Sequence, residues 1–404
     1  MSSASMLRVR RLVRILAHIP LSVLILPLVL GSVLRRRLRG SEHRPRVLFG
    51  ITPIINIKYW SQALRTRGYV SDSLVYDVYA INRREDFDHH IDGLFPRLSR
   101  NRFARQLQPY AAFLWSISRY DVLVLDFDGG CLRGTPLASA EFPLRRAAGQ
   151  HVVAIPYGAD VIDIRRCAHA PTRAALLAYD PDMSSRAGAV RRRVNHYARW
   201  ASHIVCTTMM IDYLPRFDSV VVSPIAIDTD AWSPSETDEL SPEVTILHAP
   251  NHRTLKGTEL LVRACDELRR EGLPIRLVIR ERAPNEEIRE AMRNADIVAS
   301  AFVMGYYELF AIEGMSMGKP VLNYWRPDLF HMHSLLSFAS DCPIVDAPPE
   351  LLKERIRMLA VDPQIRRRLG SAGRDYVLRH HSYEAVGAML EELVNDAWAG
   401  GGRR

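Results

Sequence analysis

The chain has 404 residues, 48% hydrophobic and 25% charged, a composition that suits two folded domains rather than a disordered or fibrous chain. Its formal net charge of +9 resides in residues 1–46, which hold ten arginines and a single acid, Glu42. The rest of the chain is formally neutral, which excludes the basic face that a nucleic-acid-binding domain needs. The five cysteines form no Cys-x-x-Cys pair, so neither a structural zinc site nor a disulfide framework is expected.

Residues 1–45 are expected to form a basic, hydrophobic segment that associates with a membrane surface through residues 8–39. Ile15 to Leu34 carries no formal charge and would be about 30 Å long as a helix, with arginines on both sides. Pro20 and Pro27 interrupt it. Three structures fit: a kinked or in-plane element at the anionic leaflet, a transmembrane helix, or a helix buried against protein. A cleaved signal peptide does not fit, because no small-residue cleavage site precedes the second arginine cluster.

The next part of the chain, residues 46–235, alternates short β-rich runs with amphipathic stretches. This pattern predicts a doubly wound parallel sheet with helices on both faces. The expected strands are Val47–Gly50, Leu74–Tyr79, Asp121–Phe127, His151–Tyr157, His203–Thr208 and Ser219–Pro224. The expected helices include Ile55–Arg67, Pro136–Ala148 and Ala187–Ala201.

A second domain of the same kind is expected over residues 236–380, after the polar stretch 228–242. Its strands would be Val244–His248, Ile275–Arg280, Asp296–Ala301, Pro320–Tyr324 and Pro343–Val345. Its helices would be Thr258–Arg270, Asn285–Arg293, Leu309–Met317 and Pro349–Leu359, with two more within Pro363–Trp398. Residues 381–404 would pack back on the first domain as a C-terminal helix. Two such domains leave a cleft, and ligands of doubly wound sheets bind beyond the carboxyl ends of the strands.

Two loops of the second domain carry residues suited to a nucleotide. Lys256 and Arg253 precede an expected helix, where basic groups are unfavourable unless an anion binds there. The alternative is a solvated basic turn. Residues 305–308 lead into another helix, whose first amides suit a phosphate. Glu313 lies one turn inside that helix and either accepts the hydroxyls of a ribose or is an exposed helical glutamate.

In the first domain, Tyr157, Gly158 and Asp160 follow an expected strand. Asp160 either orients a sugar hydroxyl or caps the next helix. The first loop, which begins at Gly50 and Thr52, lacks the glycine patterns of dinucleotide-binding and P-loop proteins. We interpret four Asp-x-Asp triplets, among them Asp126 with Asp128, as chance, and the adjacent His380 and His381 as surface residues.

Three segments resemble the group 1 retaining glycosyltransferases of bacterial cell-envelope synthesis, which have the GT-B fold: HAPNHRTLKGTELLVRA, ADIVASAFVMGYYELFAIEGMSMGKPV and RRRLGSAGRDYVLRHHSYEAV. The resemblance extends over about residues 46–394. It implies two Rossmann-like domains, a nucleoside diphosphate sugar as donor, and a lipid-linked or polysaccharide acceptor. It also implies no metal or other cofactor, and a location at the cytoplasmic face of a bacterial inner membrane.

The resemblance also assigns roles to residues. Lys256 matches the basic residue on the donor diphosphate, and Glu313 matches the second acid of an E-x7-E motif, which holds the ribose. The backbone amides of Tyr306 and Tyr307 would approach the phosphates. Asp160 would act with Lys256 and Arg253 in catalysis. Tyr157, Gly158, Gly50 and Thr52 would form the acceptor side.

Four positions depart from the family pattern. Gly305 replaces the first acid of the E-x7-E motif, and Glu308 replaces a loop glycine. Asn251 stands where an arginine is usual, although Arg253 would reach the same place, and Tyr157 replaces a histidine. Glu308 puts a negative charge beside the expected diphosphate. Two alternatives therefore stay open: a catalytically silent GT-B scaffold that binds a partner at the membrane, and a sugar-nucleotide epimerase of the same fold.

Overall fold

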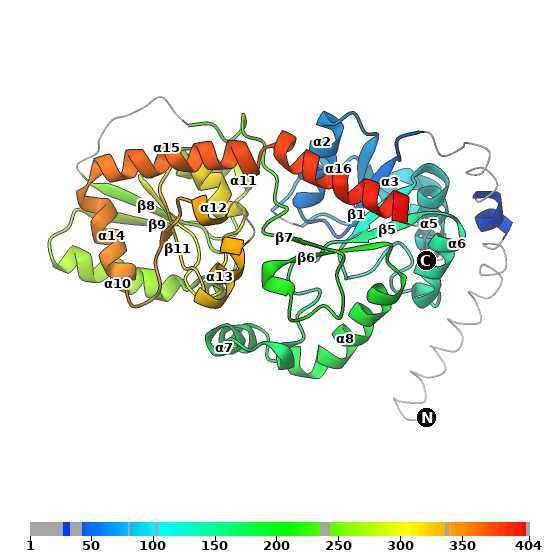
Figure 1. The fold of residues 1–404 in the computed structure, drawn as a ribbon, viewed down its shortest axis with the longest axis horizontal. Helices are drawn as coiled ribbons and strands as arrows, with labels where there is room; N and C mark the ends of the chain where they lie inside the picture. Colours follow the sequence, from blue (N-terminus) through cyan, green and yellow to red (C-terminus); the bar gives the residue numbers. More distant parts are fainter. Residues whose placement is uncertain are drawn as a thin grey trace.

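Two α/β domains lie side by side in the computed structural model, which describes residues 27–32, 43–79, 81–101, 104–234, 243–335 and 339–400 (Figure 1). Each domain is built on one sheet, and every strand pairing within the two sheets is parallel. This arrangement confirms the predicted α/β class with two doubly wound domains.

The first sheet has the strand order β3-β2-β1-β4-β5-β6-β7. Its strands are β1 (Val47–Ile51), β2 (Ser71–Val75), β3 (His89–His90), β4 (Val122–Leu125), β5 (His151–Ala154), β6 (His203–Thr207) and β7 (Ser219–Val221). Its helices are α2 (Asn56–Thr66), α3 (Ile91–Leu94), α4 (Pro96–Ser99), α5 (Gln108–Arg119), α6 (Glu141–Ala147), α7 (Ala170–Tyr179) and α8 (Met183–Trp200). The central strands β1 and β4 are buried along their whole length, as in a sheet covered on both faces.

The second sheet has the order β12-β11-β10-β8-β9. Its strands are β8 (Val244–His248), β9 (Ile275–Ile279), β10 (Ile297–Ala299), β11 (Val321–Asn323) and β12 (Val345–Asp346). Its helices are α9 (Arg253–Lys256), α10 (Thr258–Arg270), α11 (Asn285–Arg293), α12 (Leu309–Ser316), α13 (Pro327–Leu335), α14 (Leu352–Val361) and α15 (Pro363–His380). The last helix, α16 (Tyr383–Gly400), returns to the first domain. In α10, Leu261, Ala264, Cys265 and Leu268 are buried at the spacing of one helix face.

Some predicted elements differ from the structure. The stretch Leu74–Tyr79 was expected to be a strand, but β2 starts earlier and ends at Val75. The helix expected over Pro136–Ala148 is a 3-10 turn, Ala138–Ala140, followed by the short α6. Pro143 falls in the first turn of α6, where proline removes no hydrogen bond of the helix. The helices α5, α7 and α13 had no counterpart in the prediction.

The expected membrane segment is described over residues 27–32 alone, where the chain is helical. Val29 is buried in the core of the first domain, whereas Leu28 and Leu30 are 53% and 68% exposed. The remainder of the apolar run and both arginine clusters lie outside the described residues. Within the described part of the chain, none of the helices has the length and apolar character that crossing a membrane requires. The N-terminal hydrophobic helix thus stays a prediction.

The C-terminal helix α16 packs on α2 of the first domain, and Figure 1 shows it following α15 across both domains. Tyr69 donates a hydrogen bond to Asn395 at 3.0 Å, and Arg67 forms an ion pair with Glu391 at 2.8 Å. A Cβ atom at Gly387 would lie 2.4 Å from the carbonyl oxygen of Ala63. Glycine therefore sets how closely α16 approaches α2.

The chain passes between the domains twice, near residue 226 and again near residue 381. Ala226 and Val386 pack in the core of the first domain, and Ile227 packs in the core of the second. The two passages are bonded to each other: the imidazole of His381 contacts the carbonyl oxygen of Ile225 at 2.8 Å, and Ile227 N–H donates to the His381 carbonyl at 2.9 Å. The interpretation of His381 as a surface residue is wrong, because its side chain is fully buried. Burial lowers its pKa to about 4.

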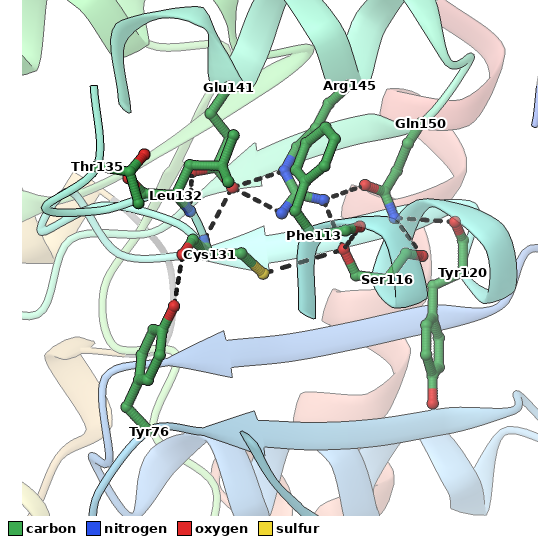
Figure 2. A network of polar contacts seen from close by, with 10 residues as sticks. All are labelled: Tyr76, Phe113, Ser116, Tyr120, Cys131, Leu132, Thr135, Glu141, Arg145 and Gln150. Carbon is green, nitrogen blue, oxygen red and sulfur yellow. Dashed lines mark hydrogen bonds and ion pairs between the residues drawn. The ribbon is translucent and has the colours of Figure 1, made fainter. Parts of the chain in front are cut away.

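A buried ion pair fixes the loop after β4 to the helices around it (Figure 2). Glu141 accepts hydrogen bonds from the backbone amides of Cys131 and Leu132 at 2.8 and 2.7 Å. Arg145, fully buried, forms an ion pair with Glu141 at 2.6 Å and donates to Ser116 at 2.9 Å. Both charged groups of the ion pair therefore make further hydrogen bonds. Such bonds are what allow an ion pair to be buried.

Replacing Arg145 with alanine should destabilise the protein by about 3–5 kcal/mol, because the Glu141 carboxylate would remain buried without its partner. The measurement is the free energy of unfolding in urea. Arg293→Ala is the control, since it removes a solvent-exposed i,i+3 pair with Glu290 and should change stability by less than about 0.5 kcal/mol. Equal, small effects of the two substitutions would contradict the structural role of the buried pair.

Candidate functional site

A cavity of about 340 Å³ lies between the two domains. Its walls come from segments that follow strands: Ile55, Ile81 and Asn82 from the first domain, and the ends of β8, β9 and β10 from the second. In parallel sheets these carboxyl ends share one edge, which is where ligands bind. Lys256, Glu308, Glu313 and Asn251 all line this cavity, as do Ala249, Pro250, Arg280, Arg282, Ala283, Asn285, Ile288, Ser300, Leu309 and Phe310.

Lys256 is held at the cavity by the single turn α9. Gly257 follows in the left-handed conformation with φ of 71°, which returns the chain into α10. The lysine is 8% exposed, and its ammonium group forms an ion pair with the carboxylate of Glu308. Glu308 is the residue just before α12. The group expected to bind a phosphate is therefore paired with an internal carboxylate.

Arg253 lies apart from the cavity lining. Its guanidinium forms ion pairs with Glu259 at 2.6 Å and with Glu281 at 3.1 Å. The expectation that Arg253 reaches the donor in place of Asn251 therefore does not match its position in the structure. Asn251 itself is exposed and lines the cavity.

Glu313 points into the cavity from the second turn of α12. It is 5% exposed, which corrects its alternative interpretation as an exposed glutamate. Burial raises the pKa of its carboxyl group to about 8, against the opposing effect of the positive charge on Arg289. At neutral pH this side chain is therefore largely protonated, and it can both donate and accept hydrogen bonds.

The loop before α12 is packed into the core. The hydroxyl of Tyr306 donates to the carbonyl of Val222, and that of Tyr307 lies 3.2 Å from the imidazole of His381. Neither tyrosine nor Gly305 lines the cavity, so neither the tyrosine side chains nor the expected backbone amides contact it. Gly305 has φ of 72°, and a Cβ atom would lie 2.5 Å from the Arg326 side chain. The loss of the first acid of the E-x7-E motif thus has a packing reason.

Asp160 organises the loops after β4 and β5. Its carboxylate accepts hydrogen bonds from the backbone amides of Phe127 at 3.0 Å and Gly158 at 2.8 Å. Burial and the nearby Asp126 raise its pKa to about 7. The cap of the next helical turn is Asp163 instead, which accepts from Arg165 N–H, so the capping alternative for Asp160 is wrong. The position of Asp160 is that of a residue that shapes the loops.

The residues expected on the acceptor side lie near Asp160 only in part, and none of them lines the interdomain cavity. The hydroxyl of Tyr157 donates to Asp128 at 2.7 Å. Burial raises the pKa of Asp126 to about 6, although the backbone N–H of Asp128 donates to its carboxylate at 2.7 Å and favours the charged form. The pair Asp126 and Asp128, interpreted from the sequence as chance, thus lies beside Asp160, with Asp126 buried and Asp128 half-buried. In the part of the chain that the structure describes, no three acidic, histidine or cysteine side chains are arranged to hold a metal ion.

At two of the positions expected on the acceptor side, the backbone conformation or its close packing requires glycine. Gly158 has φ of 143°, a conformation that other residues rarely adopt. Gly50 lies within β1, where a Cβ atom would come within 2.4 Å of the Leu74 carbonyl oxygen. The expected first loop accordingly begins two residues later than Gly50, at Thr52, because β1 extends to Ile51.

Sequence reasoning missed Arg280 and Arg282, which line the cavity beside Lys256. Their signal was their place directly after the strand β9, at the edge of the sheet where ligands bind. A second cavity of about 390 Å³ adjoins the first, and Ile55, Ile81, Asn82 and Asn285 line both. An exposed ion pair between Arg83 and Glu286 crosses from one domain to the other there. Such solvent-screened pairs hold domains together only weakly.

Comparison with solved structures identifies the fold, although no family model and no curated protein sequence matches this chain. Sucrose-phosphate synthase from Thermosynechococcus elongatus matches with a TM-score of 0.58 and 14% identity, over 88% of this chain and 100% of that one. TarM from S. aureus, in a structure that contains UDP, matches with a TM-score of 0.57 and 7% identity, over 87% and 100%. A glycosyltransferase from Rickettsia africae has a TM-score of 0.52 and 12% identity, over 88% and 99%. The chain thus has the two-domain GT-B fold of these glycosyltransferases.

Replacing Glu313 with glutamine should make stability less dependent on pH. An acid whose pKa is raised on folding, here from 4.5 to about 8, destabilises the fold progressively as pH rises between these values, because the folded state keeps a proton that the unfolded state releases. Glutamine carries no such cost. The variant should therefore gain a few kcal/mol over the wild type at pH 8, at about 1.4 kcal/mol per pKa unit, and little at pH 5.

The measurement is chemical denaturation of both proteins at pH 5, 6.5 and 8. Glu287→Gln on the exposed face of α11 should show no such trend. A difference between Glu313→Gln and the wild type that stays constant across this range would show that Glu313 is not buried as a neutral acid.

Proposed function

We propose that the protein is a glycosyltransferase that moves a sugar from a nucleoside diphosphate sugar to a lipid-linked or polysaccharide acceptor, with retention at the anomeric carbon. The observation that supports this most is the interdomain cavity, which brings Lys256 and Glu313 together at the carboxyl edges of two sheets in a GT-B fold. The cavity suits a nucleotide, because it combines apolar walls, such as Ile288 and Phe310, with cationic and carboxyl groups.

In this proposal, Glu313 holds the ribose hydroxyls and Lys256 stabilises charge on the departing diphosphate. Stabilising charge that develops in the transition state is usually a large part of catalysis. The leaving diphosphate takes the proton of the acceptor hydroxyl, so the reaction requires neither a protein nucleophile nor a metal or other cofactor. Closure of the two domains would exclude water, which competes as acceptor.

We also propose that the protein works at the cytoplasmic face of a bacterial inner membrane. The arginine-flanked apolar run in residues 8–39 supports this, as each basic residue near an anionic leaflet contributes about 1 kcal/mol. Exposure of Leu28 and Leu30, next to the buried Val29, gives this end of the first domain an apolar surface. A membrane location would bring a lipid-linked acceptor to the cleft.

Nucleotide binding tests the donor assignment. A nucleoside diphosphate that binds the folded state alone should raise the melting temperature, with about 2.7 kcal/mol of stabilisation at one hundred times its dissociation constant. The measurement is a thermal-shift panel of UDP, GDP and TDP against the full chain, with sodium phosphate at equal ionic strength as the control. If none of the three shifts the transition beyond the phosphate control, the donor assignment is wrong.

Lys256→Ala should raise the barrier of sugar transfer by about 2–4 kcal/mol, the scale of losing one group that stabilises transition-state charge. The measurement is turnover of the nucleotide sugar whose base the panel selects. Lys353→Ala provides a matched control, because Lys353 pairs with Glu267 and Glu271 on the surface of the second domain. Wild-type turnover in the Lys256 variant would refute its role.

A catalytically silent scaffold is the second candidate. The ion pair between Lys256 and Glu308 favours it, because the ammonium group expected to bind the diphosphate is already neutralised by a carboxylate of the protein. A scaffold of this kind would show no response to UDP, GDP or TDP, so the same panel separates the two functions.

A further inference from the structure

Three cationic side chains line the interdomain cavity, and they differ in whether an acid already neutralises them. Lys256 is paired with Glu308. Arg280 donates a hydrogen bond to the carbonyl of the neighbouring Ile279 at 3.3 Å and has no carboxylate partner among the described residues. Arg282 likewise has no ion pair within the described ranges. Two arginines are thus free to bind an anion in this cavity.

The local backbone directs both arginines to the same side. They follow β9, and Glu281 between them pairs with Arg253, which lies away from the cavity lining. Arg282 has φ of 54°, and no other non-glycine residue in the described part of the chain has a positive φ. Such sparsely populated conformations concentrate at ligand-binding sites.

The charge balance of the cavity matches the charge of a donor diphosphate. The Lys256 and Glu308 charges cancel each other. Burial raises the pKa of Glu313 to about 8, so this acid is largely neutral at pH 7. Among the charged side chains that line the cavity, Arg280 and Arg282 therefore have no ionised acid to offset them. The diphosphate of a nucleoside diphosphate sugar carries two negative charges, and guanidinium groups bind phosphate oxygens through paired hydrogen bonds.

On the basis of the proposed function, we infer that Arg280 and Arg282 bind the donor diphosphate and provide most of its affinity. They take the place that the family resemblance suggested for Arg253. Lys256 then acts on the additional charge that appears as the sugar leaves, when the diphosphate competes with Glu308 for it. The two arginines therefore govern donor affinity, and Lys256 governs turnover, since interactions made mainly in the transition state change kcat rather than KM.

Titration calorimetry of the full chain tests this inference. The ligands are UDP, GDP and TDP, each compared with its nucleoside: uridine, guanosine and thymidine. The proteins are the wild type, Arg280→Ala, Arg282→Ala, the double variant, and Arg263→Ala as a control with the same loss of charge on an exposed position of α10. Thermal melts without ligand verify that each variant folds.

Each cavity variant should bind the preferred nucleoside diphosphate about tenfold to hundredfold more weakly, the effect of losing one charge-assisted hydrogen-bonding group. Binding of the nucleoside should not change, and Arg263→Ala should match the wild type. For transfer, KM for the donor should rise in the arginine variants while kcat changes little.

Three results would overturn the inference. If the arginine variants bind the diphosphate as the wild type does, neither arginine holds the donor. If the variants lose the same factor in affinity for the nucleoside diphosphate and for the nucleoside, the arginines contact the base instead. A wild type that binds none of the nucleotides would refute the proposed function itself, and that result is distinct from the first two.

Discussion

Two carboxyl groups, one just before α12 and one within it, determine what charge the interdomain cavity can accept. Glu308 precedes α12 and is paired with Lys256, while Glu313, one turn later, is buried deeply enough to be largely neutral at pH 7. An ionised Glu313 and an unpaired Glu308 would repel any phosphate brought near them. The structure avoids this repulsion by pairing one acid and raising the pKa of the other. Everything proposed about the donor depends on that balance.

The first domain also contains buried acids whose pKa values are raised by burial. Asp126 and Asp160 lie in a buried cluster near the carboxyl edge of its sheet, and burial raises the pKa of both. Backbone amides from two loops converge on Asp160. The cluster therefore holds the loops after β4 and β5 in fixed positions at the carboxyl edge of the first sheet.

The polarity of parallel strands made much of the architecture predictable. Short buried runs such as Val244–His248 were predicted at their observed bounds, and the loops after them contain Lys256 and Glu308 at the cavity. The predictions that failed concern side chains whose contacts in the fold come from residues far away in the sequence. The burial of Tyr307 results from His381, seventy-four residues away, and local periodicity carries no information about such a contact. The sequence placed Arg280 at the end of a strand and gave it no role. Its side chain lines a cavity that exists only when both domains are folded together, so the local sequence could not indicate that role.

The two chain passages between the domains, bonded to each other through His381, Ile225 and Ile227, act as a double tether. A single flexible connection would allow one lobe to swivel freely against the other. Two connections held in register resist twisting and leave bending about their common line as the easy motion. The second domain would thus move on the first around a single hinge axis, and each closure would bring the carboxyl edges of the two sheets back to the same alignment.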